Sequence, residues 1–355
     1  MTNGHEQTPA KAPPASSPRI QDVAKLTGVS IMTVSRAMRG VEGVSALKRA
    51  EILRAAKRLG YRPNRNAVSL AASHSTLIGI SLPTLFNEVF ADILDGMRRT
   101  FDMAGFDLVI DNSDYDGQRE EAWVERMIDW RPAGVILSGV DHSARVREQL
   151  RGAMIPTLEI WDQQDDPIDI CVGINHEAAG EVIGAHLLAL GYRRPAFVGV
   201  EAGRDPRAEK RLAGLERAFA GHGLPVIVRR SEKHASFEAG MNETITLLDI
   251  AAKRPDCICY LNDHMAFGGL STCETSGIPV PEAMGIVGFN GLGINAVLPK
   301  PLTTVVTPRL TMGSMGARLL LARIHGAKVE RRVVVPAELF PGMTTRLQGV
   351  TRPAS

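Results

Sequence analysis

A short basic segment near the start of the chain carries side chains suited to binding DNA. Residues 31–39, with the sequence IMTVSRAMR, combine two arginines with two hydroxyl side chains. Arg36 can pair with both acceptors of a guanine edge, and Thr33 and Ser35 can reach a phosphate or a base. A helix here would expose six of these side chains, namely Ile31, Met32, Thr33, Ser35, Arg36 and Arg39. The pattern predicts a recognition helix for the major groove.

Three short helical patterns surround and position this segment. The first covers 20–26 and stops at Gly28, where a left-handed turn is easiest; the second begins after Ser30, a suitable N-cap. The third runs from Ser45 to Gly60, and its expected apolar face is Leu47, Ala50, Ile52, Leu53, Ala56 and Leu59. The spacing indicates a helix-turn-helix; the alternative is a basic three-helix domain with a solvated charged face.

Charge is distributed unevenly along the 355 residues. Residues 18–74 contain eleven Lys and Arg but three acidic residues, a net charge of +8, although the whole chain carries only +2. Residues 75–355 therefore carry −6, because Lys11 and Glu6 cancel in the first 17. A basic head on an acidic body is typical of a nucleic-acid-binding module joined to another domain.

The body alternates short β-rich runs with longer helical stretches. The predicted strands are 77–82, 107–111, 134–138, 156–160, 170–174, 195–200, 257–261 and 284–289. The predicted helices are 87–104, 117–129, 175–190, 206–221, 235–252 and 262–276. This alternation predicts parallel sheets with helices on both faces, and the number of strands requires two doubly wound lobes. The expected fold class is a small all-α head followed by a two-lobed α/β body.

Composition and motifs narrow the function class. The chain is 44% hydrophobic and 23% charged, which excludes a mainly disordered chain, and no apolar run approaches a membrane span. Residues 1–18 lack the apolar core of a signal peptide, and Cys257 and Cys259 fit buried thiols on one strand face; both features favour the cytoplasm. We expect no metal, no cofactor and no enzyme activity, since no nucleophile–base set occurs. Asp162, Asp165 and Asp166 share one loop and look solvated.

Three sequence strings carry a resemblance to a known family. VAKLTGVS and MTVSRAMRG in the head, with GYRPNRNAVSL at 60–70, resemble the DNA-binding signature of the lactose-repressor (LacI) family. The resemblance implies that Tyr61 and Asn64 contact the DNA backbone and that Leu70 wedges into the minor groove, where an apolar side chain kinks DNA. Without the family, Leu70 fits an ordinary helix core. Pro18-Arg19 stands where the family usually has a threonine cap.

The resemblance extends through the body and sets the expected domain boundaries. These are a disordered tail at 1–18, the helix-turn-helix at 19–61, a hinge helix and linker at 62–75, and a body like periplasmic binding proteins at 76–345. A homodimer on palindromic double-stranded DNA is expected, because a single small head makes few contacts. No leucine heptad follows Phe340, so we expect no added tetramer helix.

The family binds its effector between the lobes at strand ends. Matching positions are Phe90, Arg211, Asn262, Asp263 and Asn290, and Trp161 after the fourth strand could stack on a sugar. Each has a structural alternative, since Arg211 could be solvated, Asn262 could only cap a helix, and the two aromatic residues could belong to the core or the rim. His176 and His264 fall near the same cleft, where structural roles are more common.

Asn290 departs from the family pattern in a way that bears on the effector. Many family members that sense sugars and nucleosides have aspartate there, and an amide tolerates an anionic ligand that a carboxylate would repel. Arg211 could then hold a carboxylate through two hydrogen bonds. The strings LPTLFNEVFADILDGM and TPRLTMGSMGARLLLARIHG also resemble the gluconate-operon repressor branch. We expect a repressor responding to gluconate or a related sugar acid; the alternative is a receptor for a neutral sugar or nucleoside without operator-specific DNA binding.

Overall fold

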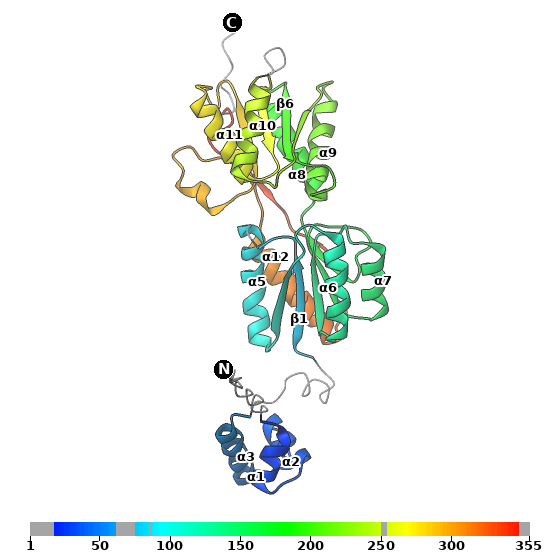
Figure 1. The fold of residues 1–355 in the computed structure, drawn as a ribbon. Helices are drawn as coiled ribbons and strands as arrows, with labels where there is room; N and C mark the ends of the chain where they lie inside the picture. Colours follow the sequence, from blue (N-terminus) through cyan, green and yellow to red (C-terminus); the bar gives the residue numbers. More distant parts are fainter. Residues whose placement is uncertain (1–17, 62–74, 86, 250–253, 348–355) are drawn as a thin grey trace, which may run out of the picture. The chain divides into compact units, whose positions relative to one another are not determined.

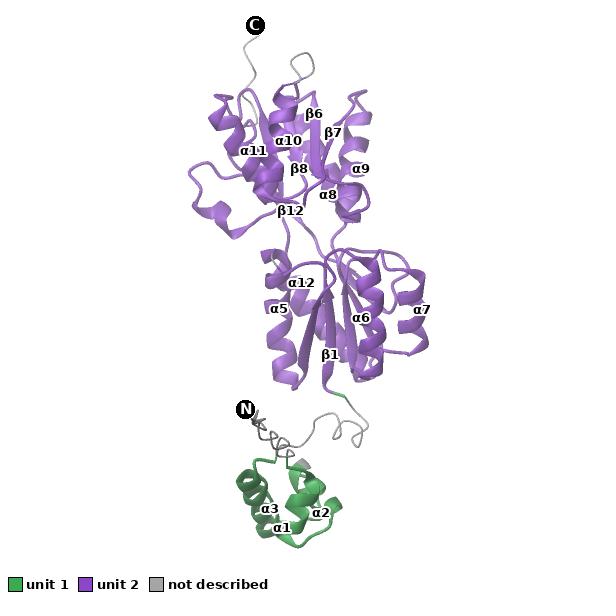
Figure 2. Ribbon diagram, in the orientation of Figure 1, with its two compact units in different colours: residues 1–75 green, residues 76–355 purple. Residues whose placement is uncertain are grey.

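The computed structural model describes residues 18–61, 75–85, 87–249 and 254–347. The chain forms two compact units, residues 1–75 and 76–355 (Figure 2). The predicted tail and hinge, with Asn64 and Leu70, lie outside the described residues except at Pro18 and Ser75.

The head is a bundle of three helices with well-formed ends. Its elements are α1 (Ile20–Thr27), α2 (Ile31–Arg39) and α3 (Ala46–Leu59) (Figure 1). The side chains of Ser30 and Ser45 cap α2 and α3, as predicted, and Gly28 ends α1 with φ of 63°. At the start of α1, the Asp22 carboxylate accepts a 2.7 Å hydrogen bond from the backbone N–H of Arg19. Asp22 thus supplies the carboxylate half of a capping box, and its own backbone N–H, which a threonine cap would accept, donates to the Arg19 carbonyl at 2.9 Å.

The core of the head is smaller than the sequence pattern suggested. Its buried members are Val23, Ala24, Val34, Ala37, Ile52 and Ala56. The predicted apolar face of α3 was partly wrong: Leu47 is 86% exposed, and Ala50 and Leu53 are also exposed. The reason is geometric, because two short helices cover only the single stripe of α3 that holds Ile52 and Ala56.

The N-terminal lobe of the body is an all-parallel sheet in the order β11-β5-β4-β3-β1-β2. Its strands are β1 (Leu77–Leu82), β2 (Asp107–Asn112), β3 (Gly134–Ser138), β4 (Thr157–Trp161), β5 (Ile170–Gly173) and β11 (Arg332–Val334). Its helices are α5 (Glu88–Ala104), α6 (Gly117–Asp129), α7 (Ala144–Gly152) and α12 (Arg309–Ile324). Side chains of α6 and α7 pack on one face of β3, and α5 and α12 contribute to the core on the other face.

The C-terminal lobe repeats this design in the order β12-β10-β9-β8-β6-β7. Its strands are β6 (Pro195–Val200), β7 (Ile227–Ser231), β8 (Cys257–Tyr260), β9 (Gly285–Asn290), β10 (Thr303–Val306) and β12 (Glu338–Phe340). Its helices are α8 (His176–Ala189), α9 (Pro206–Ala220), α10 (Phe237–Leu248), α11 (Asp263–Thr275) and the 3₁₀ turn η2 (Gly293–Val297). Cys257 and Cys259 are buried free thiols, as expected.

The two doubly wound lobes confirm the predicted fold class, but the sequence pattern missed several elements. Four strands escaped it: β7, which carries two arginines, and the short β10, β11 and β12. Helices α7 and α12 were also missed. One pair, β10 with β12, is antiparallel, whereas the pattern predicted parallel strands. Strands of three or four residues, such as β10, β11 and β12, have too few side chains to show a period of two.

The strand order brings the candidate site to one edge of each sheet. In each lobe the strand order reverses between the first strand and the third, that is, between β1 and β3 and between β6 and β8. Open α/β sheets bind ligands at such points, beyond the carboxyl ends of the strands.

The chain passes between the lobes three times, at 174–175, 307–308 and 335–337 (Figure 1). In the described part of the chain, no helix is both long and apolar enough to span a membrane.

A close contact between two helices fixes the position of Arg211. A Cβ placed on Gly180 of α8 would lie 2.1 Å from the carbonyl oxygen of Arg211, and one on Gly214 of α9 would lie 2.0 Å from that of Glu177. Only glycine permits this approach, so α9 packs directly against the backbone of α8. The guanidinium of Arg211 therefore extends from a rigid helix pair.

Candidate DNA-binding and effector-binding sites

Helix α2 exposes three of the six predicted recognition side chains. Ile31, Met32 and Arg36 are exposed, and Thr33 and Ser35 are half-buried. The hydroxyl of Thr33 lies 2.9 Å from that of Ser30, so it also belongs to the cap of α2. Arg39 is the last residue of α2, and its side chain lies outside the described part of the structure. The exposed apolar pair at the start of α2 is the kind of surface that contacts thymine methyl groups.

Tyr61 is the last predicted DNA contact that the structure describes. It follows α3, is half-buried, and donates its backbone N–H to the carbonyl of Ala56 at 2.9 Å. Burial raises the pKa of its phenol. The hydroxyl thus stays protonated, and a protonated hydroxyl can donate a hydrogen bond to a phosphate oxygen.

A cleft of about 390 Å³ opens between the two lobes of the body. Its lining residues follow strand ends of both sheets: Thr84, Asn87, Val89, Phe90, Asp114, Tyr115, Trp161, Val200, Arg204, Asp205, Arg207, Arg211, His234, Ala235, Leu261, Asn262, His264 and Asn290. Five of the six predicted effector positions are among them. This volume is in the range of small-molecule sites.

Asp263 is the predicted effector residue that does not line the cleft. Its buried carboxylate accepts hydrogen bonds from the Thr304 hydroxyl at 2.6 Å and from the backbone N–H of Leu292 at 2.8 Å. These bonds hold the side chain between β9 and β10, so in this structure Asp263 supports the cleft edge and does not line it, contrary to the expected placement. Its neighbour Asn262 faces the cleft and also caps α11 through the N–H of Met265.

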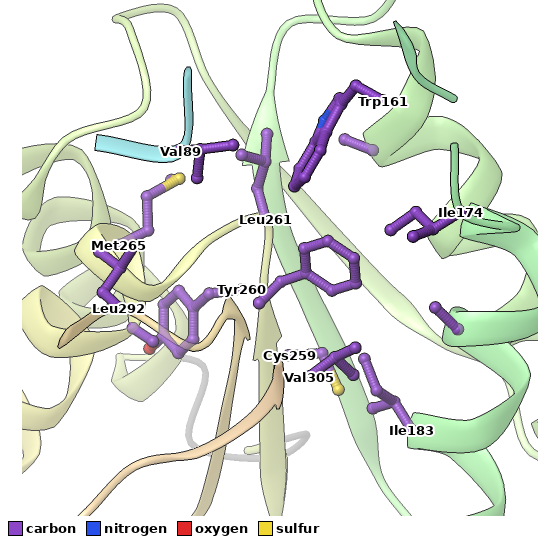
Figure 3. Close-up of a cluster of buried hydrophobic side chains, with 14 of the residues drawn as sticks. Val89, Trp161, Ile174, Ile183, Cys259, Tyr260, Leu261, Met265, Leu292 and Val305 are labelled. Carbon is purple, nitrogen blue, oxygen red and sulfur yellow. The ribbon is translucent and has the colours of Figure 1, made fainter. Parts of the chain in front are cut away.

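An aromatic pair forms one wall of the cleft. The rings of Phe90 and Trp161 meet edge to face with centroids 6.3 Å apart. Trp161 ends β4 with φ of 87°, a conformation that side-chain-bearing residues seldom adopt. Figure 3 shows Trp161, Val89 and Leu261 at one end of the buried cluster that contains Ile183 and Val305. The C–H faces of a sugar pack well on such a surface.

Two guanidiniums with different surroundings lie in the cleft. Arg207 is paired with Asp205 at 3.0 Å, and it also donates to the Ser138 hydroxyl at 3.4 Å. Burial alone would raise the pKa of Asp205, but Arg207 and Arg211 together hold it at about 2. Arg211, only 5% exposed, donates to the Leu261 carbonyl at 3.0 Å and to a ring nitrogen of His176. The two arginines thus differ in whether a carboxylate balances them.

Arg211 has no carboxylate partner among the described residues, and its Nε–H is buried without an acceptor. Burial lowers the pKa of Arg211 to about 10; the negative charge of Asp205 opposes this shift, and the cation of Arg207 adds to it. A buried cation with no carboxylate within ion-pair distance favours an anion at its side.

Comparisons with known proteins identify both the head and the body of the chain. The sequence profile described as "Bacterial regulatory proteins, lacI family" matches residues 19–64, and "Periplasmic binding protein-like domain" matches 185–345. The HTH-type transcriptional regulator GntR of Escherichia coli K12 is 35% identical over 317 residues, which cover 89% of this chain and 95% of that protein. The chain belongs to the LacI family of bacterial transcription regulators.

Other LacI-family proteins extend this match. GntR of Pseudomonas aeruginosa is 32% identical over 88% of this chain and 91% of its own. A LacI-family regulator from Silicibacter pomeroyi has a TM-score of 0.86 at 34% identity, covering 92% of this chain and 99% of that one. The lac repressor dimer bound to operator and the anti-inducer ONPF has a TM-score of 0.78 at 25% identity, covering 93% and 99%. These relatives support a DNA-binding regulator over the alternative of a receptor without DNA binding.

The structure corrects the view of the 162–166 loop as solvated. Asp162 is only 1% exposed, and its carboxylate accepts a 2.6 Å hydrogen bond from the ammonium group of Lys210 on α9. Burial raises the pKa of Asp162, although Lys210 opposes the shift. Asp165 and Asp166 are exposed, as expected. Within the described ranges, no group of three or more His, Cys, Asp or Glu could hold a metal ion.

Asp205 and Arg207 are functional candidates that the sequence analysis missed. Asp205 follows the loop after β6, caps α9 and precedes Pro206 at the first helical position. An Asp-Pro helix start after a buried strand was a usable signal, because it places a carboxylate at the carboxyl edge of the sheet. His264, which the sequence analysis did place near the cleft, is one of its lining residues. The centroid of its ring lies 4.9 Å from that of Phe237.

Proposed function

We propose that this LacI-family regulator is a repressor that responds to a sugar acid, with gluconate as the leading candidate. The observation that carries the proposal is the buried guanidinium of Arg211 in the cleft without a carboxylate partner among the described residues. An aldonate carboxylate supplies the missing charge and can accept two parallel N–H bonds. The resemblance to the gluconate-operon branch, together with the match to regulators named GntR, supports gluconate.

The remaining cleft residues suit the hydroxyl-bearing part of such a ligand. Asp205 offers a carboxylate acceptor, and Asn262 retains its amide N–H donors after its oxygen has capped α11. Trp161 and Phe90 offer apolar surface for carbon-bound hydrogens. The cleft thus combines a cation and polar groups from the C-terminal lobe with an aromatic wall from the N-terminal lobe, which suits a linear polyol with one anionic end.

Calorimetry with gluconate, galactonate, glucose and adenosine tests this proposal. Gluconate or another aldonate should bind with the highest affinity, because only an aldonate neutralises Arg211. Tighter binding of glucose or adenosine than of every aldonate would replace the proposal with the neutral-ligand alternative. Turnover of these compounds should be absent.

Asn290→Asp gives an independent test of ligand charge. Asn290 lines the cleft, and its backbone carbonyl accepts hydrogen bonds from the side chains of Thr307 and Arg309. At a separation of about 8 Å and an effective dielectric of about 20, a new carboxylate would weaken an anionic ligand by about 2 kcal/mol. Calorimetry should show this loss for gluconate and a smaller change for glucose. Equal gluconate affinity in the variant and the parent would contradict an anionic effector.

We propose further that the protein works as a homodimer on a two-fold operator. Phe237, Met241 and Ile245 are exposed, lie four residues apart along α10 and form an apolar stripe that a second copy could cover.

In such a dimer, closing of the lobes on the effector would change the spacing of the two hinges, and therefore of the two DNA-binding heads. Because such coupling is reciprocal, operator DNA should change effector affinity by the same factor.

Sedimentation measures the oligomeric state directly. The parent protein should be a dimer at micromolar concentration, and Met241→Glu should shift it toward monomer by burying a charge in the interface. Met154→Glu is a control at an exposed methionine on the other lobe and should leave the dimer intact. A monomeric parent, both with and without DNA, would contradict the proposed assembly.

A further inference from the structure

The imidazole of His176 links the cleft guanidinium to the N-terminal lobe. His176 is the first residue of α8, directly after the chain crosses from β5, and it is 1% exposed. One ring nitrogen, Nδ1, lies 3.0 Å from Nη1 of Arg211 on α9. The other, Nε2, lies 3.1 Å from the carbonyl oxygen of Trp161, the last residue of β4. A single ring therefore touches the cation of one lobe and the strand end of the other.

The two partners determine the protonation of this ring. A guanidinium only donates hydrogen bonds and a carbonyl only accepts them, so Nδ1 must accept from Arg211 and Nε2–H must donate to Trp161. Burial and the cations of Arg211 and Arg207 hold the pKa of His176 well below its usual value. The ring is therefore neutral near pH 7, in the Nε2–H tautomer.

Packing leaves the ring and the guanidinium little freedom. The His176 ring lies between those of Trp161 and Phe289, with centroids 5.9 and 5.8 Å away. The guanidinium carbon of Arg211 lies 4.2 Å from the centre of the Phe289 ring, and the Leu261 carbonyl accepts from Nη2. Arg211 is thus held by a ring face, a carbonyl and an imidazole, and only the imidazole also contacts the N-terminal lobe.

We propose that His176 is a positioning residue that aims Arg211 at an anionic effector and transmits effector binding to the N-terminal lobe. The inference rests on the proposed anionic effector. A ligand carboxylate that binds to Arg211 also acts on His176, and through His176 on the backbone of Trp161. That backbone has the strained φ of 87°, and the Nε2–H bond to its carbonyl helps to hold it there.

Two substitutions separate hydrogen bonding from packing. His176→Phe keeps an aromatic ring but loses both hydrogen bonds, whereas His176→Gln keeps one acceptor and one donor. Calorimetry should show gluconate affinity falling about 10- to 100-fold in His176→Phe and recovering for the most part in His176→Gln. When gluconate occupies the cleft to the same extent in both proteins, it should also release a smaller fraction of operator DNA from His176→Phe than from the parent, because the link to Trp161 is lost.

The control is His186→Phe, which removes a half-buried histidine of the same helix. His186 bonds the Thr345 hydroxyl at 3.1 Å and does not line the cleft. This variant should lower the unfolding temperature without changing gluconate affinity. Gluconate binding and operator release by His176→Phe that equal those of the parent would overturn the inference, as would a loss that His176→Gln does not relieve.

Nitrogen NMR of histidine-labelled full-length protein tests the ring without ligand. The His176 signals, assigned by their absence from His176→Gln, should show a neutral Nε2–H tautomer at pH 7. A protonated ring or an Nδ1–H tautomer would overturn the inference. If the parent binds no gluconate, the proposal of gluconate as effector is wrong. The tautomer measured by NMR still decides whether His176 accepts a hydrogen bond from Arg211.

Discussion

Replacing Arg211 with alanine should abolish the response to gluconate while leaving operator binding by the unliganded protein nearly unchanged. The guanidinium is buried in the cleft without a carboxylate partner among the described residues, so an anionic effector depends on it for charge and hydrogen bonds. Loss of one member of a buried, hydrogen-bonded charge pair costs about 2–5 kcal/mol, which is roughly a 30-fold or greater drop in affinity. Calorimetry and an operator-release assay measure the two effects.

Arg217→Ala is the matched control for this substitution. Arg217 lies on the same helix, but it is exposed and paired with Glu177 and Glu181. Its removal should leave gluconate affinity unchanged, because exposed ion pairs contribute little. Thermal unfolding should show that Arg211→Ala still folds, since the substitution removes a buried cation that forms no ion pair in the described structure. Normal gluconate binding by a folded Arg211→Ala protein would rule out Arg211 as the carboxylate receptor.

Arg36→Ala should lower affinity for the operator far more than affinity for random DNA. Arg36 is exposed on α2 beside Ile31 and Met32, the surface predicted to enter the major groove. If its guanidinium reads a guanine, the loss is about 1–3 kcal/mol on the cognate site and is confined to that site. Fluorescence anisotropy with operator and scrambled duplexes at one salt concentration measures the difference.

Arg54→Ala provides the contrast from the third helix of the head. Arg54 is exposed on α3, outside the predicted recognition surface. Its neutralisation should weaken binding equally on any sequence, with a smaller salt dependence, or have no effect. Equal losses on operator and scrambled DNA for Arg36→Ala would instead identify Arg36 as a phosphate contact.

The candidate sites were predictable wherever a side chain's role follows from local chain geometry. The caps at Ser30 and Ser45 and the left-handed turn at Gly28 depend on a few neighbouring residues, and the structure confirms all three. The family motif placed Phe90 and Asn290 at the cleft, because strand ends in a doubly wound sheet always meet at one edge.

Roles that depend on distant partners could not be predicted in this way. Asp263 follows a strand directly, as a ligand contact should, yet Thr304 lies 41 residues further along the chain and holds its carboxylate away from the cleft. Asp162 looked solvated because its loop is acidic, but Lys210 reaches it from the other lobe. In both cases a hydrogen bond across a long sequence separation decides the direction of the side chain.

The sequence by itself therefore determined the family, the order of head and body and the basic helix-turn-helix, since these follow from motifs, composition and local periodicity. Only the tertiary structure decided which charges in the cleft are balanced. Arg207 and Arg211 are four residues apart on one helix, but Asp205 neutralises the first, while the second contacts a neutral imidazole and a carbonyl. Burial makes that difference large, because a cation removed from water is stabilised only by the groups that packing brings to it.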